Sequence, residues 1–230
     1  MGDDANRLAL VNSERRDMGI PASYALALPA GWIHLSAGTP DEMLRQADRS
    51  FASRPGDNWR AEVGSLFEAA YAPDTSHSVL DTFMTSGPVP GTSIAASITV
   101  ARAALAEAVN HSAEDVLLAR SLGAGAEVLS VAGSVAVLTP LDQPPALPRG
   151  SARVLSSTSV LLAVPQRDDF LLALVFTVLT DQAPTGPDLH AAETRVNSSL
   201  VELFRALLTT FRWIDDGGAV MQASPGEHDD

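Results

Sequence analysis

The sequence predicts an α+β domain, a three-layer α/β/α sandwich with a mainly antiparallel sheet. Residues 170–180 are apolar on both faces of a strand, so both faces need covers, most simply helices. Residues 188–213 carry apolar side chains at helical spacing, which predicts a long helix along one sheet face. Short loops join neighbouring β-rich runs, and such hairpin-like connections favour antiparallel pairing.

The composition is that of a folded protein, and it excludes functions that need cysteine. The chain has 230 residues, of which 46% are hydrophobic and 19% charged, and this length fits one domain with a sizeable core. Its 28 acidic residues outnumber 15 basic ones, giving a net charge of −13, so nucleic acid and anionic membranes are poor partners. The absence of Cys excludes disulfides, thiolate nucleophiles and zinc fingers. All the basic residues are Arg, which is typical of a GC-rich genome and excludes lysine-dependent catalysis.

We expect one domain between two disordered ends. Residues 1–21 are polar and aperiodic, which predicts a disordered leader. Residues 22–214 form the single α/β domain, and residues 215–230 are an acidic tail that we also expect to be disordered. Leu8–Val11 is too short for a signal peptide, and no stretch has the roughly 18 uninterrupted apolar residues of a membrane span. We therefore expect a cytoplasmic protein.

The first third of the domain contains two extended segments followed by two helices. The strand at 24–28 is stopped by Pro29, and an extended segment resumes at 32–35. Thr39, Pro40 and Glu42 have the pattern of a capped helix start. Apolar residues recur at helical spacing between 58 and 72, which predicts an amphipathic helix.

The rest of the domain alternates hairpins with helices. In chain order we expect strands at 77–86 and 92–101, helical residues at 102–109, a short helix from Ser112 to Gly123, strands at 127–131 and 134–138, a proline-rich loop at 140–150, strands at 152–164 and 170–180, and the helix at 188–213. The proline-rich loop is read as a surface connection, with polyproline-type recognition as the alternative.

Two segments carry a resemblance to a known group. The opening Tyr24-Ala-Leu-Ala-Leu-Pro-Ala-Gly-Trp32 and the closing run from Val164-Pro165 to Arg212-Trp213 resemble the Mog1/PsbP-like α/β/α sandwich proteins. The likeness extends to a set of actinobacterial proteins of about this length, some of them encoded near type VII secretion genes. It implies a binding, assembly or scaffold role and carries over no catalytic residues.

Motifs for catalysis and cofactors are missing. The five histidines show no i, i+4 pair, so a two-His helical metal site is absent. Gly123-Ala-Gly125 has Val128 where a dinucleotide-binding loop needs glycine, and no Gly-x-Ser-x-Gly occurs. His34 lies on an apolar strand, which predicts a partly buried histidine with a satisfied ring.

Two polar clusters have structural interpretations. Asp168 and Asp169 are adjacent, but adjacent side chains point apart, so the pair fits a turn better than the two carboxylates of a glycosidase. Ser156, Ser157 and Ser159 are read as a solvated stretch of strand.

The sequence thus predicts a non-catalytic interaction or accessory protein with a protein partner of unknown identity and no cofactor or metal. The alternative is a small apolar ligand bound between sheet and helices, with Trp32, Trp59 or Trp213 near the pocket mouth. A third hypothesis is a hydrolase that uses Ser or Asp/Glu chemistry.

Overall fold

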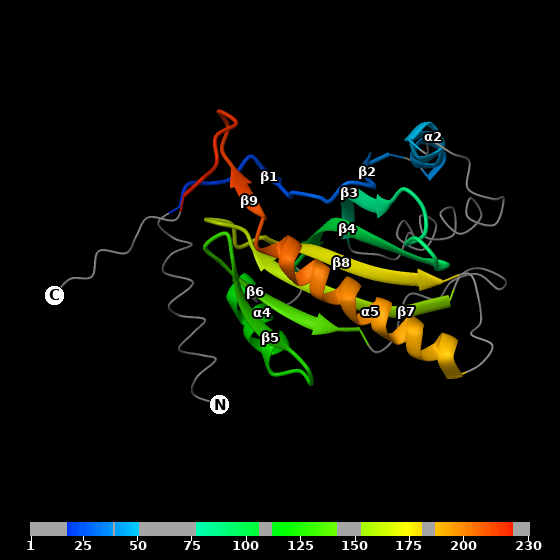
Figure 1. Ribbon diagram of the computed structural model, residues 1–230. Helices are drawn as coiled ribbons and strands as arrows, with labels where there is room; N and C mark the ends of the chain where they lie inside the picture. The colour runs from blue at the N-terminus through cyan, green and yellow to red at the C-terminus, as the bar shows by residue number, and fades with distance from the viewer. Residues whose placement is uncertain are drawn as a thin grey trace.

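A computed structural model describes six segments of the chain: residues 18–38, 40–50, 77–105, 112–141, 153–180 and 187–222. Within them the protein is α+β, with a seven-stranded sheet, a two-stranded ribbon and three helices (Figure 1). The helix expected at 58–72, Trp59 and most of the proline-rich loop lie outside the described residues. None of the described helices has both the length and the apolar character needed to cross a bilayer.

Every neighbouring pair in the seven-stranded sheet is antiparallel, as the hairpin-like connections predict. Across the sheet the strands are β2 (Trp32–Ser36), β3 (His77–Thr85), β4 (Ile94–Ala104), β8 (Phe170–Thr180), β7 (Arg153–Ala163), β6 (Ser134–Pro140) and β5 (Glu127–Val131). The central strands β4, β8 and β7 are the longest at 11 residues each.

One face of the sheet, called the α5 face, is covered by helix α5 (Pro187–Leu208). Alternate β8 residues point to this face, and Phe176 stacks on Phe204 of α5 with ring centroids 4.7 Å apart. Leu200 and Leu207 extend the contact along the helix. The other set of alternating β8 residues points to the opposite face, so the expectation of a strand buried on both sides is confirmed.

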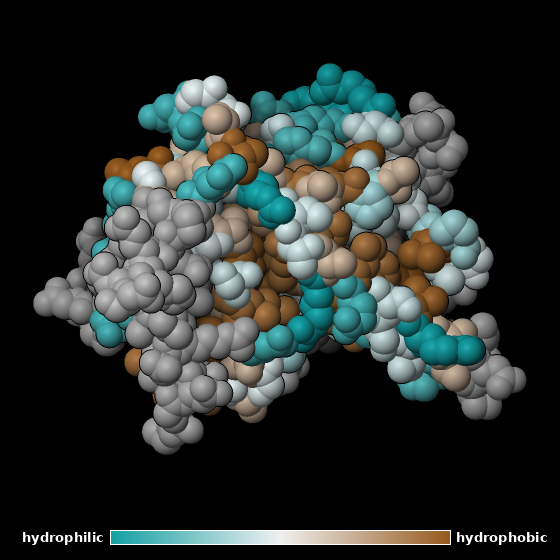
Figure 2. Space-filling view, turned by 60° about the vertical axis from the view of Figure 1, so that its left-hand side comes forward, coloured by the Kyte–Doolittle hydropathy of each residue, from teal (hydrophilic) through white to brown (hydrophobic). Residues whose placement is uncertain are grey.

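The opposite face, called the α4 face, carries two shorter helices. Helix α4 (Ala113–Ser121) begins at a capping box in which Ser112 and Asp115 exchange hydrogen bonds, and its Leu117 is fully buried against the sheet. Helix α2 (Pro40–Ser50) buries Met43 against β2 and β3. Figure 2 shows hydrophilic side chains at the top of the molecule, where Figure 1 places α2, and hydrophobic ones across the middle.

The ribbon of β1 (Ser23–Ala25) and β9 (Arg212–Ile214) packs at the end of α5 (Figure 1). Phe211 lies between Tyr24, on which it stacks, and Trp213, which meets it edge-on. Trp213 Nε1 also donates to Ser134 Oγ at 3.0 Å, which ties the ribbon to β6.

Two helix predictions are wrong at their edges. The long helix ends at Leu208 rather than 213, because Thr209 and Thr210 turn their hydroxyls back onto carbonyls of the last turn and the chain then enters β9. Residues 102–104 continue β4 rather than starting a helix, since Arg102 pairs with β8 and lies over the Phe170 ring. Residues 106–109 are outside the described part.

The described fold extends beyond both expected domain boundaries. Met18, placed in the leader by the sequence, is 2% exposed, and its carbonyl accepts a hydrogen bond from Gln166. Residues 215–222, placed in the tail, turn back on β9: Asp215 Oδ1 accepts from two backbone amides, and Ile214 bridges to Val220. These short segments belong to the packed structure.

Candidate functional site

Strand β2 forms one edge of the sheet and presents part of its backbone outward. Two backbone hydrogen bonds flank the pairing of β2 with β3: Ser86 N donates to Gly31 O, and Ala37 N donates to Leu80 O. Since hydrogen-bonded positions alternate along an antiparallel strand, the backbone groups of Ile33 and Leu35 are the ones that pair with β3. The amide and carbonyl groups of the alternate residues Trp32, His34 and Ser36 therefore point away from the sheet. Among the described residues, no backbone group pairs with those of Trp32 or His34.

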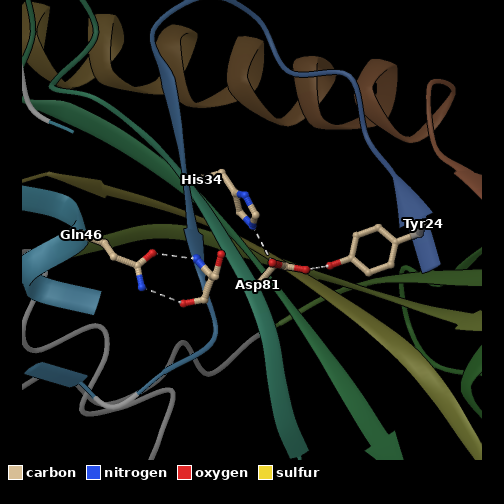
Figure 3. Close-up of polar contacts among 5 residues, drawn as sticks. Tyr24, His34, Gln46 and Asp81 are labelled. Carbon is tan, nitrogen blue, oxygen red and sulfur yellow. Dashed lines mark hydrogen bonds and ion pairs between the residues drawn. The ribbon is translucent and has the colours of Figure 1, made fainter. Parts of the chain in front are cut away.

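The third outward position is filled by a side chain. Gln46 of α2 accepts from Ser36 N at 3.1 Å and donates to Ser36 O at 3.4 Å (Figure 3). A glutamine amide has the same donor and acceptor as a peptide group, so Gln46 pairs with the edge as a neighbouring strand does. This contact closes the edge at Ser36, whereas the outward backbone groups of Trp32 and His34 have no backbone partner within the described part of the chain.

A β-bulge in β3 brings a carboxylate to this edge. Val79 pairs with Ala101 and Asp81 pairs with Val100, so Leu80 is an extra residue in the ladder. In a regular strand Asp81 would share the face of Val79, whereas the bulge turns it to the α5 face. There it meets side chains from β1 and β2.

Asp81 accepts hydrogen bonds from two aromatic side chains (Figure 3). The Tyr24 hydroxyl donates to Oδ2, and His34 Nε2 lies 2.5 Å from Oδ1. Burial raises the pKa of the Tyr24 hydroxyl above its ordinary 10.0, and the hydrogen bond to Asp81 and its charge raise it further. Tyr24 is therefore held as a neutral donor, and Asp81 is held by donors from two segments distant in sequence.

His34 is half exposed, with 49% of its side-chain surface accessible, and its ring stacks on Phe83 at 4.8 Å. Its partner Asp81 satisfies the ring as the sequence predicts, although the ring is less buried than expected. Because the carboxylate accepts at Nε2, a neutral ring has its lone pair at Nδ1. Among the described residues, no hydroxyl is hydrogen-bonded to His34, so this Asp–His pair lacks the third member of a hydrolase triad there.

The structure separates the predicted tryptophan contacts. Trp32 is partly buried on the α5 face beside His34, at the free edge of β2. Trp213 is 3% exposed and packs in the core with Phe211, so little of its surface can meet a partner. Trp59 is not described. Both placed tryptophans contact the same hydrophobic cluster beneath α5, Trp213 as a buried member and Trp32 as a partly buried neighbour.

The acidic pair and the serine cluster have the structural roles that the sequence favours, with one difference. Arg167 binds both carboxylate oxygens of Asp169 at 2.9 Å and lowers the pKa of that exposed group. The serines, however, are not a solvated stretch: Ser157 is 4% exposed and donates to Phe176 O, while Ser156 donates to Asn197 of α5 at 2.6 Å.

The edge site has only a weak signal in the sequence. His34 and Asp81 are each a titratable residue within a predicted extended segment, and such groups need partners when partly buried. That rule requires a partner for each residue but does not identify the partner.

Comparisons with protein-family models, curated proteins and solved structures found no match.

Proposed function

We propose that this chain is a non-catalytic interaction protein that binds an extended segment of a protein partner as an added strand along β2. The observation that supports it is the outward-facing backbone of Trp32 and His34, with the Gln46 amide bound beside them at Ser36. Each open residue offers one N–H and one C=O, which is the pattern that a peptide strand pairs with.

The side chains of the edge would give this binding its specificity. Trp32 and His34 project to the same face of β2, next to the backbone groups that point outward. The indole offers apolar area and the imidazole a polar atom at Nδ1. A segment with one apolar side chain and one hydrogen-bond donor, two residues apart, fits this pair.

The wider parts of the proposal rest on the pattern of the fold. Helices packed on both sheet faces support a three-layer sandwich of the Mog1/PsbP-like kind. The link to a secretion system draws on the resemblance in sequence, and the cytoplasmic location draws on the short apolar runs of the sequence, none of which has the length of a signal peptide or a membrane span. The accessory role belongs to the same proposal, in which the protein binds a partner and does not catalyse a reaction.

The test is affinity capture from the native host with the full chain and two matched variants. His34→Ala removes the imidazole but keeps the backbone amide, whereas His34→Pro removes both. Proline is tolerated at an edge position whose N–H faces outward, and Ile33 already has the extended backbone that a following proline requires. The two variants therefore differ at the group that strand addition uses.

We expect the wild-type chain to enrich a partner reproducibly and His34→Ala to recover less of it, because the ring contact is lost while the backbone pairing remains. His34→Pro should recover about tenfold less, as expected for the loss of one backbone hydrogen bond and the bulk of the ring at the edge. Circular dichroism checks that both variants fold. Equal capture by the two variants, or no enriched partner, would contradict strand addition.

A further inference from the structure

A cavity of about 200 Å³ lies on the α4 face, on the opposite side of the sheet from Tyr24, His34 and Asp81. Its floor is made by neighbouring strands β6, β7 and β8, and its described wall includes the last turn of α4. The described lining residues are Arg120, Thr139, Leu141, Ser159, Leu161, Ala173 and Val175. Trp32 and Trp213, the two tryptophans that the structure describes, are not among them.

The floor is arranged in two rows by strand pairing. Thr139, Ser159 and Val175 are direct partners across the three strands, so their side chains share one face and one row. Leu161 and Ala173 are paired in the next row. The cavity therefore has two hydroxyls side by side at one position and aliphatic carbon next to them.

The polar groups of the lining have no partner within the described part of the chain. No hydrogen bond or ion pair there engages the guanidinium of Arg120 or the hydroxyls of Thr139 and Ser159. Other polar side chains nearby are satisfied, since Ser157 bonds to Phe176 O and Ser121 to Leu118 O. Three polar groups that line one small, mainly apolar cavity and lack a partner among the described residues fit a ligand site.

The chemistry of these groups selects an anion with a planar pair of oxygens. Arg offers a fork of N–H donors that matches a carboxylate, and each hydroxyl can donate one bond. Directly opposed residues of an antiparallel pair have Cα atoms roughly 4.5–5.5 Å apart, so Thr139 and Ser159 can reach the two oxygens of one carboxylate. The negative end of the α4 dipole opposes this, but at about half a charge it is weaker than the full charge of Arg120.

The volume limits the rest of the ligand. A protein cavity of roughly 150 Å³ lined by aliphatic and aromatic side chains holds benzene. The present cavity of about 200 Å³ therefore has room for an apolar group of about the size of benzene together with one carboxylate. From these observations we propose that the cavity binds a small monocarboxylate with an apolar body, of the size of hexanoate or benzoate. This site is independent of the β2 edge.

The proposal is tested with sodium hexanoate and sodium benzoate on the full chain, with hexanamide as the uncharged probe. Isothermal titration measures affinity, and methyl NMR locates the site. Hexanoate should bind saturably, shift the methyls of Leu161 and Val175, and leave those of Leu172 and Val178 on the opposite face in place. Hexanamide should bind about tenfold more weakly, since it lacks the charge that Arg120 pairs with.

Two variants and one control complete the design. Arg120→Gln should lower the affinity for hexanoate about tenfold. It should not change the fold, because Arg120 is exposed. Ala173→Val adds two methyl groups to the cavity and should lower the affinity for both hexanoate and benzoate. Arg195→Gln, at an exposed position on α5, is the matched control and should bind as the wild type does. Absence of saturable binding, binding unchanged by Arg120→Gln, or methyl shifts spread over both faces would overturn the proposal.

Discussion

Tyr24→Phe removes a single hydroxyl that links the β1–β9 ribbon to the sheet. The hydroxyl donates to the Asp81 carboxylate, which is 24% exposed and so only partly screened by water. A hydrogen bond to a charged group contributes about 1.5–3 kcal/mol, and the lower figure suits this partly exposed carboxylate. We expect Tyr24→Phe to lower the free energy of unfolding at pH 7 by about 1.5 kcal/mol.

This difference should depend on pH in a defined direction. The folded state raises the pKa of Tyr24 above 10.0, so above pH 10 the unfolded chain binds fewer protons than the native one. The stability that Tyr24 contributes is therefore fully present below pH 10 and is lost as pH rises. For an unfolded pKa of 10.0 the loss reaches about 1.4 kcal/mol at pH 11. The wild type and Tyr24→Phe should then be about equally stable at pH 11.

Urea unfolding followed by circular dichroism at pH 7, 9, 10 and 11 measures both quantities. The other tyrosine, Tyr71, is present in both proteins, so its titration cancels in the difference. A second comparison in an Asp81→Ala background isolates the contact, because the acceptor is gone and most of the effect of Tyr24→Phe should vanish there. A stability difference that stays constant between pH 7 and 11, or that survives in Asp81→Ala, would refute the reasoning.

Two further predictions concern the core and the ribbon. Phe204→Ala removes a fully buried ring stacked on Phe176 and should lower the free energy of unfolding, measured in urea, by about 3–5 kcal/mol. Phe204→Leu should lower it clearly less, and equal losses would mean that the ring does not fill its site. Trp213→Phe leaves the fully buried Ser134 hydroxyl without its donor and should lower the free energy of unfolding by about 1–3 kcal/mol beyond the effect of the change in size. Adding Ser134→Ala should recover part of that loss, and a double variant less stable than the single one would contradict this.

The sequence predicts most elements of the sheet because its strands obey local rules. The strands at 77–85, 94–104, 153–163 and 170–180 are runs rich in β-branched and apolar residues that are bounded by loops, and the start of α4 is a complete capping box. The sequence does not predict the end of α5 at Leu208, because Phe211 and Ile214 continue the helical spacing by coincidence. The two threonines before them end the helix through hydroxyl contacts that periodicity does not report.

The candidate site was less predictable, because it depends on a bulge and on long-range pairing. Alternation along a regular strand puts Asp81 on the face of Val79, away from Tyr24 and His34. Only the extra residue at Leu80 reverses this, and no turn residue or proline marks it in the sequence. The size of Trp32 and the turn before it are visible in the sequence, whereas the backbone that β2 presents outward depends on the order of strands in the sheet.

A second bulge shows that redirection of a polar side chain is a repeated device in this fold. In β7, Val154 pairs with Leu179 and Ser156 with Val178, so the bulge turns Ser156 to the α5 face, where it bonds Asn197. Each bulge thus supplies one polar contact between the sheet and an element packed on it: Asp81 fixes the ribbon, and Ser156 fixes α5.

Hydrophobic burial on the α5 face is non-directional and would tolerate sliding of either element, whereas a hydrogen bond fixes position and angle. The bulge in β3 also acts on the edge, because Asp81 holds His34 from the inner side of β2. The backbone that β2 presents is therefore ordered before any partner arrives, which lowers the entropic cost of adding a strand there. The same contact that stabilises the fold thus prepares the edge for binding.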